Sequence, residues 1–309
     1  MIDTISAHAI DAGYDTIHFW YPEKPGNLSY VTNWSETSKA DGSTYRTGHL
    51  DNYRVFVSDR GISLKGSLSR HFLGSNCETL TRSDTENAIL SISDRLSLPM
   101  EKAKITRLDF GQNVLMEYPP DIYFPYLGRS NYLKRIVRPH GISYQNGKRQ
   151  FYMYDKIAEL KAKRMTLPDI MNGSNVIRLE LRLTSRPDHL LKQQITGATL
   201  SDSNFLQSMK ERYVSEYRAI EKIAAFQLNL AMMKTPGDFI EQMAAFGICK
   251  LGMEATMQLV DELKARKTFA NCEEYSRLKK KLRQLSEMRG TTTTSPLIDE
   301  LTAKVESVL

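Results

Sequence analysis

The chain has 309 residues and a formal net charge of +6; 41% of the residues are hydrophobic and 25% are charged. This composition excludes an intrinsically disordered chain, and no run approaches the roughly 18–20 apolar residues that a bilayer span needs. The excess of Lys and Arg favours a polyanionic partner, because these side chains release condensed counterions from nucleic acid.

Two further classes of protein are disfavoured. Cys77, Cys249 and Cys272 are far apart and form no CxxC pair, so we expect reduced thiols and neither a disulfide framework nor a zinc site. The opening MIDTISAHAIDAGYD lacks the basic and apolar regions of a secretory signal. We therefore expect a cytoplasmic protein that does not contact a membrane.

The first part of the chain favours strands and loops, because short β-prone stretches alternate with Gly, Pro, Asn, Asp and Ser. These stretches are Tyr14–Tyr21, Leu28–Thr32 and Tyr53–Val57. Gly61–Asn76 predicts a strand that runs into a short basic stretch and a turn. Thr81–Leu96 fits a helix, in which Ser83 and Glu86 have the spacing of a capping box, so Ser83 is the expected N-cap.

Two later segments predict strands with distinct faces. Asn175–Thr184 alternates strictly, with Ile177, Leu179, Leu181 and Leu183 on one face and Arg178, Glu180 and Arg182 on the other. Lys104–Val114 is expected to place Thr106, Leu108 and Phe110 on one face and Ile105, Arg107 and Asp109 on the other. Between these segments, Arg149–Ile157 is aromatic and β-prone, and Ala158–Arg164 is helix-prone.

From about residue 200 the pattern becomes that of long helices. The expected helices are Asn204–Leu230, Phe239–Phe246, Gly252–Lys267 and the basic Glu273–Met288, followed by a linker at Gly290–Pro296. The sequence thus predicts an α+β protein, with an antiparallel-rich sheet domain over residues 1–198 and a helical domain over residues 199–309. The sheet is expected to carry helices on one side and the functional site on the other.

The segments ITRLDF, FYMYDKIAEL and VIRLELRL carry a family resemblance. They contain Arg107-Leu108-Asp109, Tyr154-Asp155-Lys156 with Glu159, and Arg178-Leu179-Glu180. This order of motifs resembles the filamentous-phage gene II/X type replication initiators and, more distantly, the rolling-circle plasmid initiators of the Rep_trans group. Leu64–Asn76 and the opening Met1-Ile2-Asp3 also match family segments, and the resemblance spans about residues 1–200.

The resemblance implies that residues 1–198 form a replication endonuclease that nicks one strand of origin DNA in a host bacterial cell. Tyr154 is the implied nucleophile, which joins the 5′ end and later rejoins the strand. A phenol has a pKa near 10, so a nearby cation must favour the phenolate. Lys156 is the candidate, because Tyr152, Tyr154 and Lys156 share one face if the strand continues that far.

The resemblance also implies a metal site. Asp109 and Glu180 are the expected ligands of Mg²⁺ or Mn²⁺, which prefer oxygen donors and polarise a scissile phosphate. Glu159 is either a third ligand or a salt-bridge partner. The related HUH nucleases hold their ion with a His-hydrophobic-His pair, which this sequence lacks. Salt bridges from Asp109 and Glu180 to neighbouring arginines are the alternative interpretation.

DNA, as a single-stranded or hairpin origin, is the expected partner, together with a host helicase and polymerase. The candidate DNA contacts are Lys65, Arg70, His71, Arg107 and Arg178. The alternative to a DNA contact is an ordinary basic turn at Lys65–His71 and a solvated face at Lys279–Lys281. For Tyr144 and Tyr152, the alternatives to a catalytic tyrosine at 154, core packing is the other interpretation. The sequence has no GxxxxGK[ST] loop, which disfavours a built-in helicase. The rival function is a non-catalytic protein that binds and melts the origin or recruits host factors.

Overall fold

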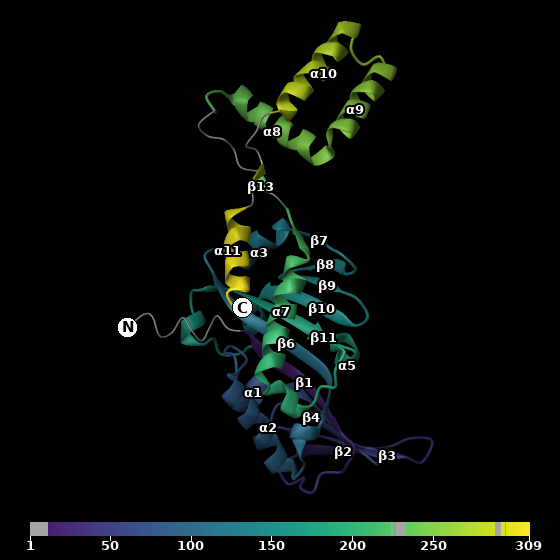
Figure 1. Ribbon diagram of the computed structural model, residues 1–309, viewed down its shortest axis with the longest axis vertical. Helices are drawn as coiled ribbons and strands as arrows, with labels where there is room; N and C mark the ends of the chain where they lie inside the picture. Colours follow the sequence, from purple (N-terminus) through teal and green to yellow (C-terminus); the bar gives the residue numbers. More distant parts are fainter. Residues whose placement is uncertain (1–11, 224, 227–232, 288–291, 294) are drawn as a thin grey trace. The chain divides into compact units, whose positions relative to one another are not determined.

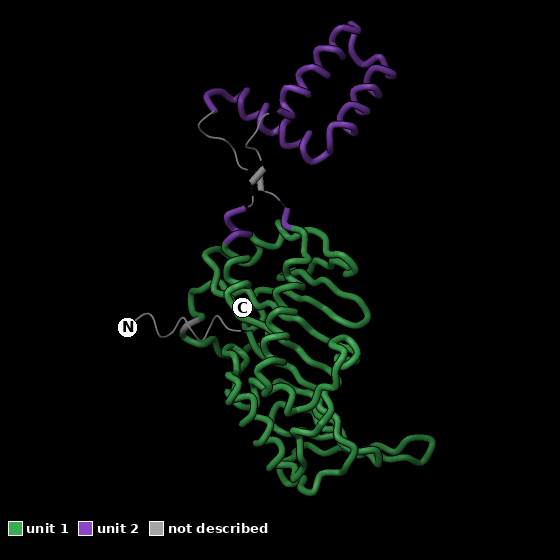
Figure 2. Tube along the Cα trace, viewed as in Figure 1, with its two compact units in different colours: residues 1–221, 300–309 green, residues 222–299 purple. Residues whose placement is uncertain are grey.

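The computed structural model describes residues 12–223, 225–226, 233–287, 292–293 and 295–309. Packing divides the chain into two units, Met1–Glu221 with Glu300–Leu309, and Lys222–Asp299 (Figure 2). The sequence match at Met1-Ile2-Asp3 lies outside the described residues. The domain boundary predicted after residue 198 stays a prediction, but the packing boundary falls later, because the helix that follows belongs to the sheet unit.

The first unit is built on a ten-stranded sheet in the order β2-β3-β4-β5-β1-β6-β11-β10-β9-β8, in which neighbouring strands pair antiparallel. The sheet confirms the predicted α+β class. Its strands are β1 (Gly13–Tyr21), β2 (Thr32–Ser38), β3 (Thr44–Leu50), β4 (Tyr53–Ser58), β5 (Gly61–Ser67), β6 (Lys104–Met116), β8 (Lys134–Arg138), β9 (Gly141–Gln145), β10 (Arg149–Asp155) and β11 (Asn175–Leu183). The small pairs are β7 (Leu127–Ser130) with β12 (Ile220–Lys222), and β13 (Ala225–Phe226) with β14 (Thr292–Thr293).

One face of this sheet is apolar and packs against helices. Leu179 and Leu181 of β11 are fully buried there, as their alternation predicts. Helix α7 (Ser203–Arg218) crosses this face, and its Tyr213 ring lies 5.9 Å from Phe110 and 5.5 Å from Phe151 (Figure 1). The other helices of this unit are α1 (Leu68–Leu73), α2 (Arg82–Leu96), α3 (Pro120–Tyr123), α4 (Lys156–Ala162), α5 (Pro187–Leu191), α6 (Gly197–Leu200) and the end of α11 (Pro296–Glu306).

A register shift changes the faces at the start of β6. His18 of β1 pairs with Arg107 and Phe19 pairs with Ile105, so Thr106 is an extra residue at a bulge. Ile105 is therefore fully buried and Thr106 is exposed. The predicted faces are reversed at these two positions, because Thr106 was expected to share the face of Leu108 and Phe110. Beyond the bulge the alternation holds, and Asp109 lies opposite the core face.

Two predicted helix ends were wrong. Thr81 rather than Ser83 caps α2, because Asp84 completes a capping box with Thr81. The helix predicted to run to residue 230 ends at Arg218, because the chain continues as strand β12 and pairs with β7. Pairing between distant segments overrides the local helix preference here.

The second unit contains helices α8 (Pro236–Leu251), α9 (Met253–Ala265) and α10 (Cys272–Ser286). Helix α8 runs through Gly247, where the sequence predicted a break. Ala245, Ile248 and Leu285 form a small core between α8 and α10. Within the described ranges, no helix combines the length and the apolarity that crossing a bilayer requires.

Candidate active site on the polar face of the sheet

The sheet face opposite α7, which we call the polar face, gathers charged side chains from three neighbouring strands. In register, Arg178 of β11 lies beside Tyr154 of β10, and Arg182 of β11 lies beside Asp109 of β6. Side chains alternate along a strand, so Glu180, between the two arginines, points the same way. Residues that are far apart in the sequence are thus brought into one cluster.

Tyr154 lies at the centre of this cluster and is 6% exposed. Its hydroxyl donates a hydrogen bond to Glu180 Oε1 at 3.0 Å, and its ring stacks on Tyr152 at 4.7 Å. Burial, followed by the charge of Glu180, raises the pKa of Tyr154 well above 10. The phenol is therefore protonated at neutral pH, and its proton points at a carboxylate.

Glu180 is an ionised carboxylate held by two arginines. Arg178 Nε donates to its Oε1 at 2.6 Å, and Arg182 Nε donates to its Oε2 at 2.7 Å. Burial by itself raises the pKa of Glu180, but the two guanidinium groups lower it to about 2. Glu180 therefore carries a full negative charge beside the Tyr154 hydroxyl.

Arg178 is a buried connection between two carboxylates. Its side chain is 4% exposed, and it pairs with Asp15 at 2.7 Å as well as with Glu180. Its Nη1 also donates to the Asn76 carbonyl oxygen at 3.2 Å and to Asn113 Oδ1 at 3.3 Å. The structure thus places this predicted DNA contact inside the protein, where its guanidinium orients the acids.

Asp109 is buried but less completely neutralised than Glu180. Arg107 donates to it through two nitrogens, at 2.9 and 2.7 Å, and Arg182 Nε lies 3.9 Å away. Burial raises the pKa of Asp109 to about 6, in spite of the opposing effect of Arg107. The salt bridges considered as an alternative from the sequence are present for both Asp109 and Glu180.

Lys156 does not lie on the strand face beside Tyr154. Asp155 ends β10 and caps α4, since its side chain accepts from the Ala158 amide at 2.9 Å, so Lys156 begins the helix. Its fully buried ammonium donates to Asn76 Oδ1 at 3.0 Å and to Glu159 Oε2 at 2.7 Å. Glu159 also pairs with Lys163. Of the two roles considered for Glu159, the structure therefore shows that of a salt-bridge partner.

A polar cavity of about 340 Å³ joins most of the predicted site. Its walls include Asp15, Lys65, Arg70, Arg107, Asp109, Tyr154, Glu159, Glu180 and Arg182. His71 is not among its lining residues; the imidazole is 1% exposed and pairs with Asp51 at 2.9 Å. Three of the five predicted DNA contacts therefore reach the cavity, together with the predicted nucleophile and all three predicted metal ligands.

The donor atoms around this cavity are of the type that Mg²⁺ and Mn²⁺ prefer. Asp15, Asp109 and Glu180 contribute carboxylate oxygens. Each is already paired with a guanidinium, and among the described residues no three acidic, His or Cys side chains are placed to hold one ion together.

Three residues of the site were missed from the sequence. Arg182 lines the cavity and follows the same alternation as Arg178 and Glu180, which could have identified it. Asn76 ends a segment that matches the family, and its side chain accepts from Lys156 and donates to Asp15 at 3.0 Å. Asp15 carried only a weak signal, because it is a single acid in a strand that is otherwise free of acids.

An α+β protein whose sheet presents a tyrosine, acids and arginines to one cavity is suited to reactions of a phosphate group. The family model for the N-terminal part of the phage gene II replication-associated protein matches residues 14–209. The chain therefore belongs to this family of replication-associated proteins, the filamentous-phage gene II family. No curated protein matches the chain.

Proposed function

We propose that this protein initiates rolling-circle replication by nicking one strand of origin DNA through Tyr154. The observation that carries the proposal is the Tyr154 hydroxyl in the polar cavity, hydrogen-bonded to Glu180 at 3.0 Å and surrounded by arginines, in a member of a replication family. The phenolic oxygen attacks the scissile phosphorus, a phosphotyrosine bond forms, and the bond to the 3′ oxygen breaks. The free 3′-OH then primes a host polymerase, with strand separation by a host helicase.

The arginines supply charge neutralisation for the phosphate. Arg107 and Arg182 are 23% and 24% exposed, so their guanidinium groups are accessible from the cavity. When Arg182 turns toward a phosphate, Glu180 loses one of its two cations, and the pKa of Glu180 rises toward its ordinary range. Glu180 then becomes a better acceptor for the Tyr154 proton, and the leaving 3′ oxygen takes up a proton from water.

We also propose that the reaction uses Mg²⁺ or Mn²⁺. Asp109 and Glu180 are the ligands that the cavity offers, with Glu159 as a further acid at its wall. A bound ion would polarise the scissile phosphate. Incubation with a chelator should abolish nicking, and Mn²⁺ should restore it; full activity in the chelator would exclude the metal.

The rival proposal is a non-catalytic origin-binding protein, and the dense ion pairing of Asp109 and Glu180 favours it. A test separates the two: the protein is incubated with single-stranded origin DNA and Mn²⁺, then denatured. We expect a protein–DNA adduct that Tyr154→Phe abolishes. Tyr144→Phe is the matched control, because Tyr144 is fully buried and donates to the Gly128 carbonyl oxygen at 2.9 Å. Loss of the adduct in Tyr144→Phe alone, or no adduct at all, contradicts the nicking proposal.

A further inference from the structure

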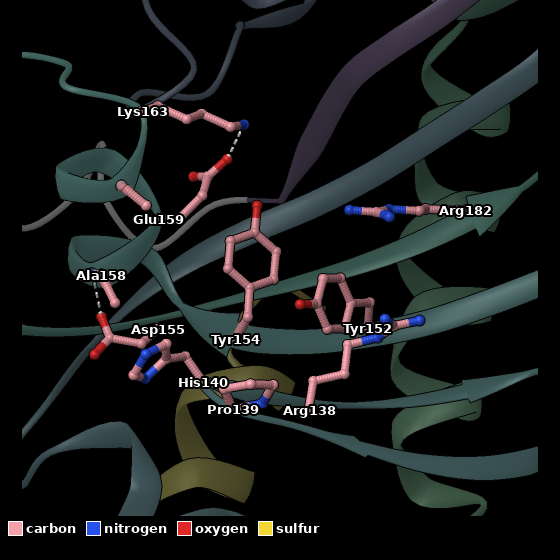
Figure 3. A pocket seen from close by; sticks show the side chains of 11 residues that line it. Arg138, Pro139, His140, Tyr152, Tyr154, Asp155, Ala158, Glu159, Lys163 and Arg182 are labelled. Atoms are coloured by element: carbon pink, nitrogen blue, oxygen red, sulfur yellow. Dashed lines mark hydrogen bonds and ion pairs between the residues drawn. The ribbon is translucent and has the colours of Figure 1, made fainter.

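A second cavity, of about 440 Å³, is also lined by Tyr154. We call it the aromatic cavity. Its walls come from β10, from α4 and from the turn between β8 and β9, and they include Arg138, Pro139, Tyr152, Tyr154, Ala158 and Ala162 (Figure 3). Its volume falls in the range of pockets that hold small organic groups. The polar cavity and the aromatic cavity share Tyr154, Glu159, Lys163 and Arg182, so the two spaces adjoin at the proposed nucleophile.

The walls of the aromatic cavity suit a flat aromatic ligand. The rings of Tyr152 and Tyr154 stack on each other, 4.7 Å apart at 28°, and both border the cavity (Figure 3). Pro139 and the methyl groups of the two alanines add apolar surface, and the walls are completed by His140, Asp155, Glu159 and Lys163. Arg138 and Arg182 lie 5.9 and 5.0 Å from the centre of the Tyr152 ring, so cations border this surface.

The neighbouring polar cavity narrows the kind of aromatic ligand to one that carries a phosphate. A ligand in the aromatic cavity sits next to a space with Lys65, Arg107 and Arg182 in its walls, which suits a phosphate. A nucleotide joins an aromatic base to a phosphate, so one nucleotide can occupy both adjoining spaces. Base–tyrosine stacking with flanking arginines is the usual means by which proteins hold single strands without reading their sequence.

We propose that the aromatic cavity binds one unstacked nucleobase of the DNA strand, next to the scissile phosphate. The inference rests on the proposed function and adds the place where one base of the strand is held. A base inside a duplex is stacked on both sides and cannot reach the two tyrosine rings. This agrees with the single-stranded or hairpin origin expected from the sequence, and Tyr152 is a binding residue rather than core packing.

The test measures binding, not nicking, and is done in a chelator with the full chain. The probes are fluorescent oligo(dT) of about 12 nucleotides and a base-free strand of the same length. Tyr152→Ala should weaken binding of oligo(dT) about tenfold or more and leave binding of the base-free strand unchanged, because only the stacking contact is lost. Tyr152→Phe keeps the ring and should bind oligo(dT) like the original protein.

Two further variants complete the design. Ala162→Phe fills the cavity from the exposed side of α4 and should weaken oligo(dT) binding even if Tyr152→Ala folds poorly. Tyr132→Ala removes a tyrosine that is 92% exposed and lies outside the cavity, and should change nothing. Equal effects of Tyr152→Ala on both strands, or no effect of Ala162→Phe, overturn the inference. The adduct assay is scored separately, so a failure of nicking is distinguishable from a failure of base binding.

Discussion

Replacing Glu180 by Ala should destabilise the sheet unit strongly, even though the residue lies at the proposed site. Glu180 is 4% exposed and accepts hydrogen bonds from Arg178, Arg182 and Tyr154. The variant leaves Arg178, whose side chain is 4% exposed, with one of its two carboxylate partners missing. Removing one partner of a buried ion pair typically costs about 3–5 kcal/mol.

The pKa of Glu180 gives a second measure of the same interaction. A difference of one in pKa corresponds to about 1.36 kcal/mol, so the lowering from 4.5 to about 2 corresponds to about 3 kcal/mol. Because the pKa is lower in the folded state, this contribution is fully present above pH 4.5 and is lost as the pH falls toward about 2. Glu180→Ala should therefore cost most at neutral pH and least in acid.

Urea unfolding followed by tryptophan fluorescence is the suitable assay. The chain contains two tryptophans, Trp20 and Trp34, and both lie in strands of the sheet unit, so the signal reports that unit alone. Glu36→Ala is the matched control, because Glu36 forms an exposed pair with Arg46 at 3.7 Å and should cost less than about 1 kcal/mol. A loss below about 1 kcal/mol for Glu180→Ala, or a loss that grows in acid, would refute the reasoning.

Three further outcomes follow from the structure. Asp109→Asn should stabilise the metal-free protein at neutral pH by up to about 3 kcal/mol in urea unfolding, because the pKa is raised from 3.8 to about 6; the gain should shrink as the pH falls from about 6 to 3.8. Thr81→Ala should lower the free energy of unfolding by about 1 kcal/mol through its lost cap, and Ser83→Ala should not. Gly111→Ala should lower the melting temperature, since its Cβ would lie 2.7 Å from the Leu179 carbonyl oxygen.

The parts of the fold that sequence could predict are those with a strict local pattern. The alternation in β11 fixes both of its faces, because one face is buried against α7 and the other carries charges. The start of β6 could not be predicted, because the bulge at Thr106 arises from the register with β1. Strand β12 was missed for a similar reason, since it exists through pairing with β7.

The site was predictable to the same extent. Tyr154, Asp109 and Glu180 share a cavity because alternation within each strand and antiparallel order between strands place them on one face. Asp15 could not be inferred, because it reaches Arg178 across β6 from a strand far earlier in the chain. The position of Lys156 depended on where β10 ends, and the cap formed by Asp155 decides that point.

Arg107, Arg178 and Arg182 differ in exposure, and this difference indicates that they have different roles in the charged cluster. Buried ion pairs contribute little net stability, because desolvation offsets their attraction, so stability alone does not account for so many in one place. Arg178, 4% exposed, is fixed by Asp15 and Glu180 and keeps these acids in position. Arg107 and Arg182 are 23% and 24% exposed, and in the proposed reaction each would exchange its carboxylate for a phosphate without moving into or out of the core. In the proposed reaction, an incoming phosphate would replace one anion by another at the same guanidinium groups, and the carboxylate released beside Tyr154 would become free to accept its proton.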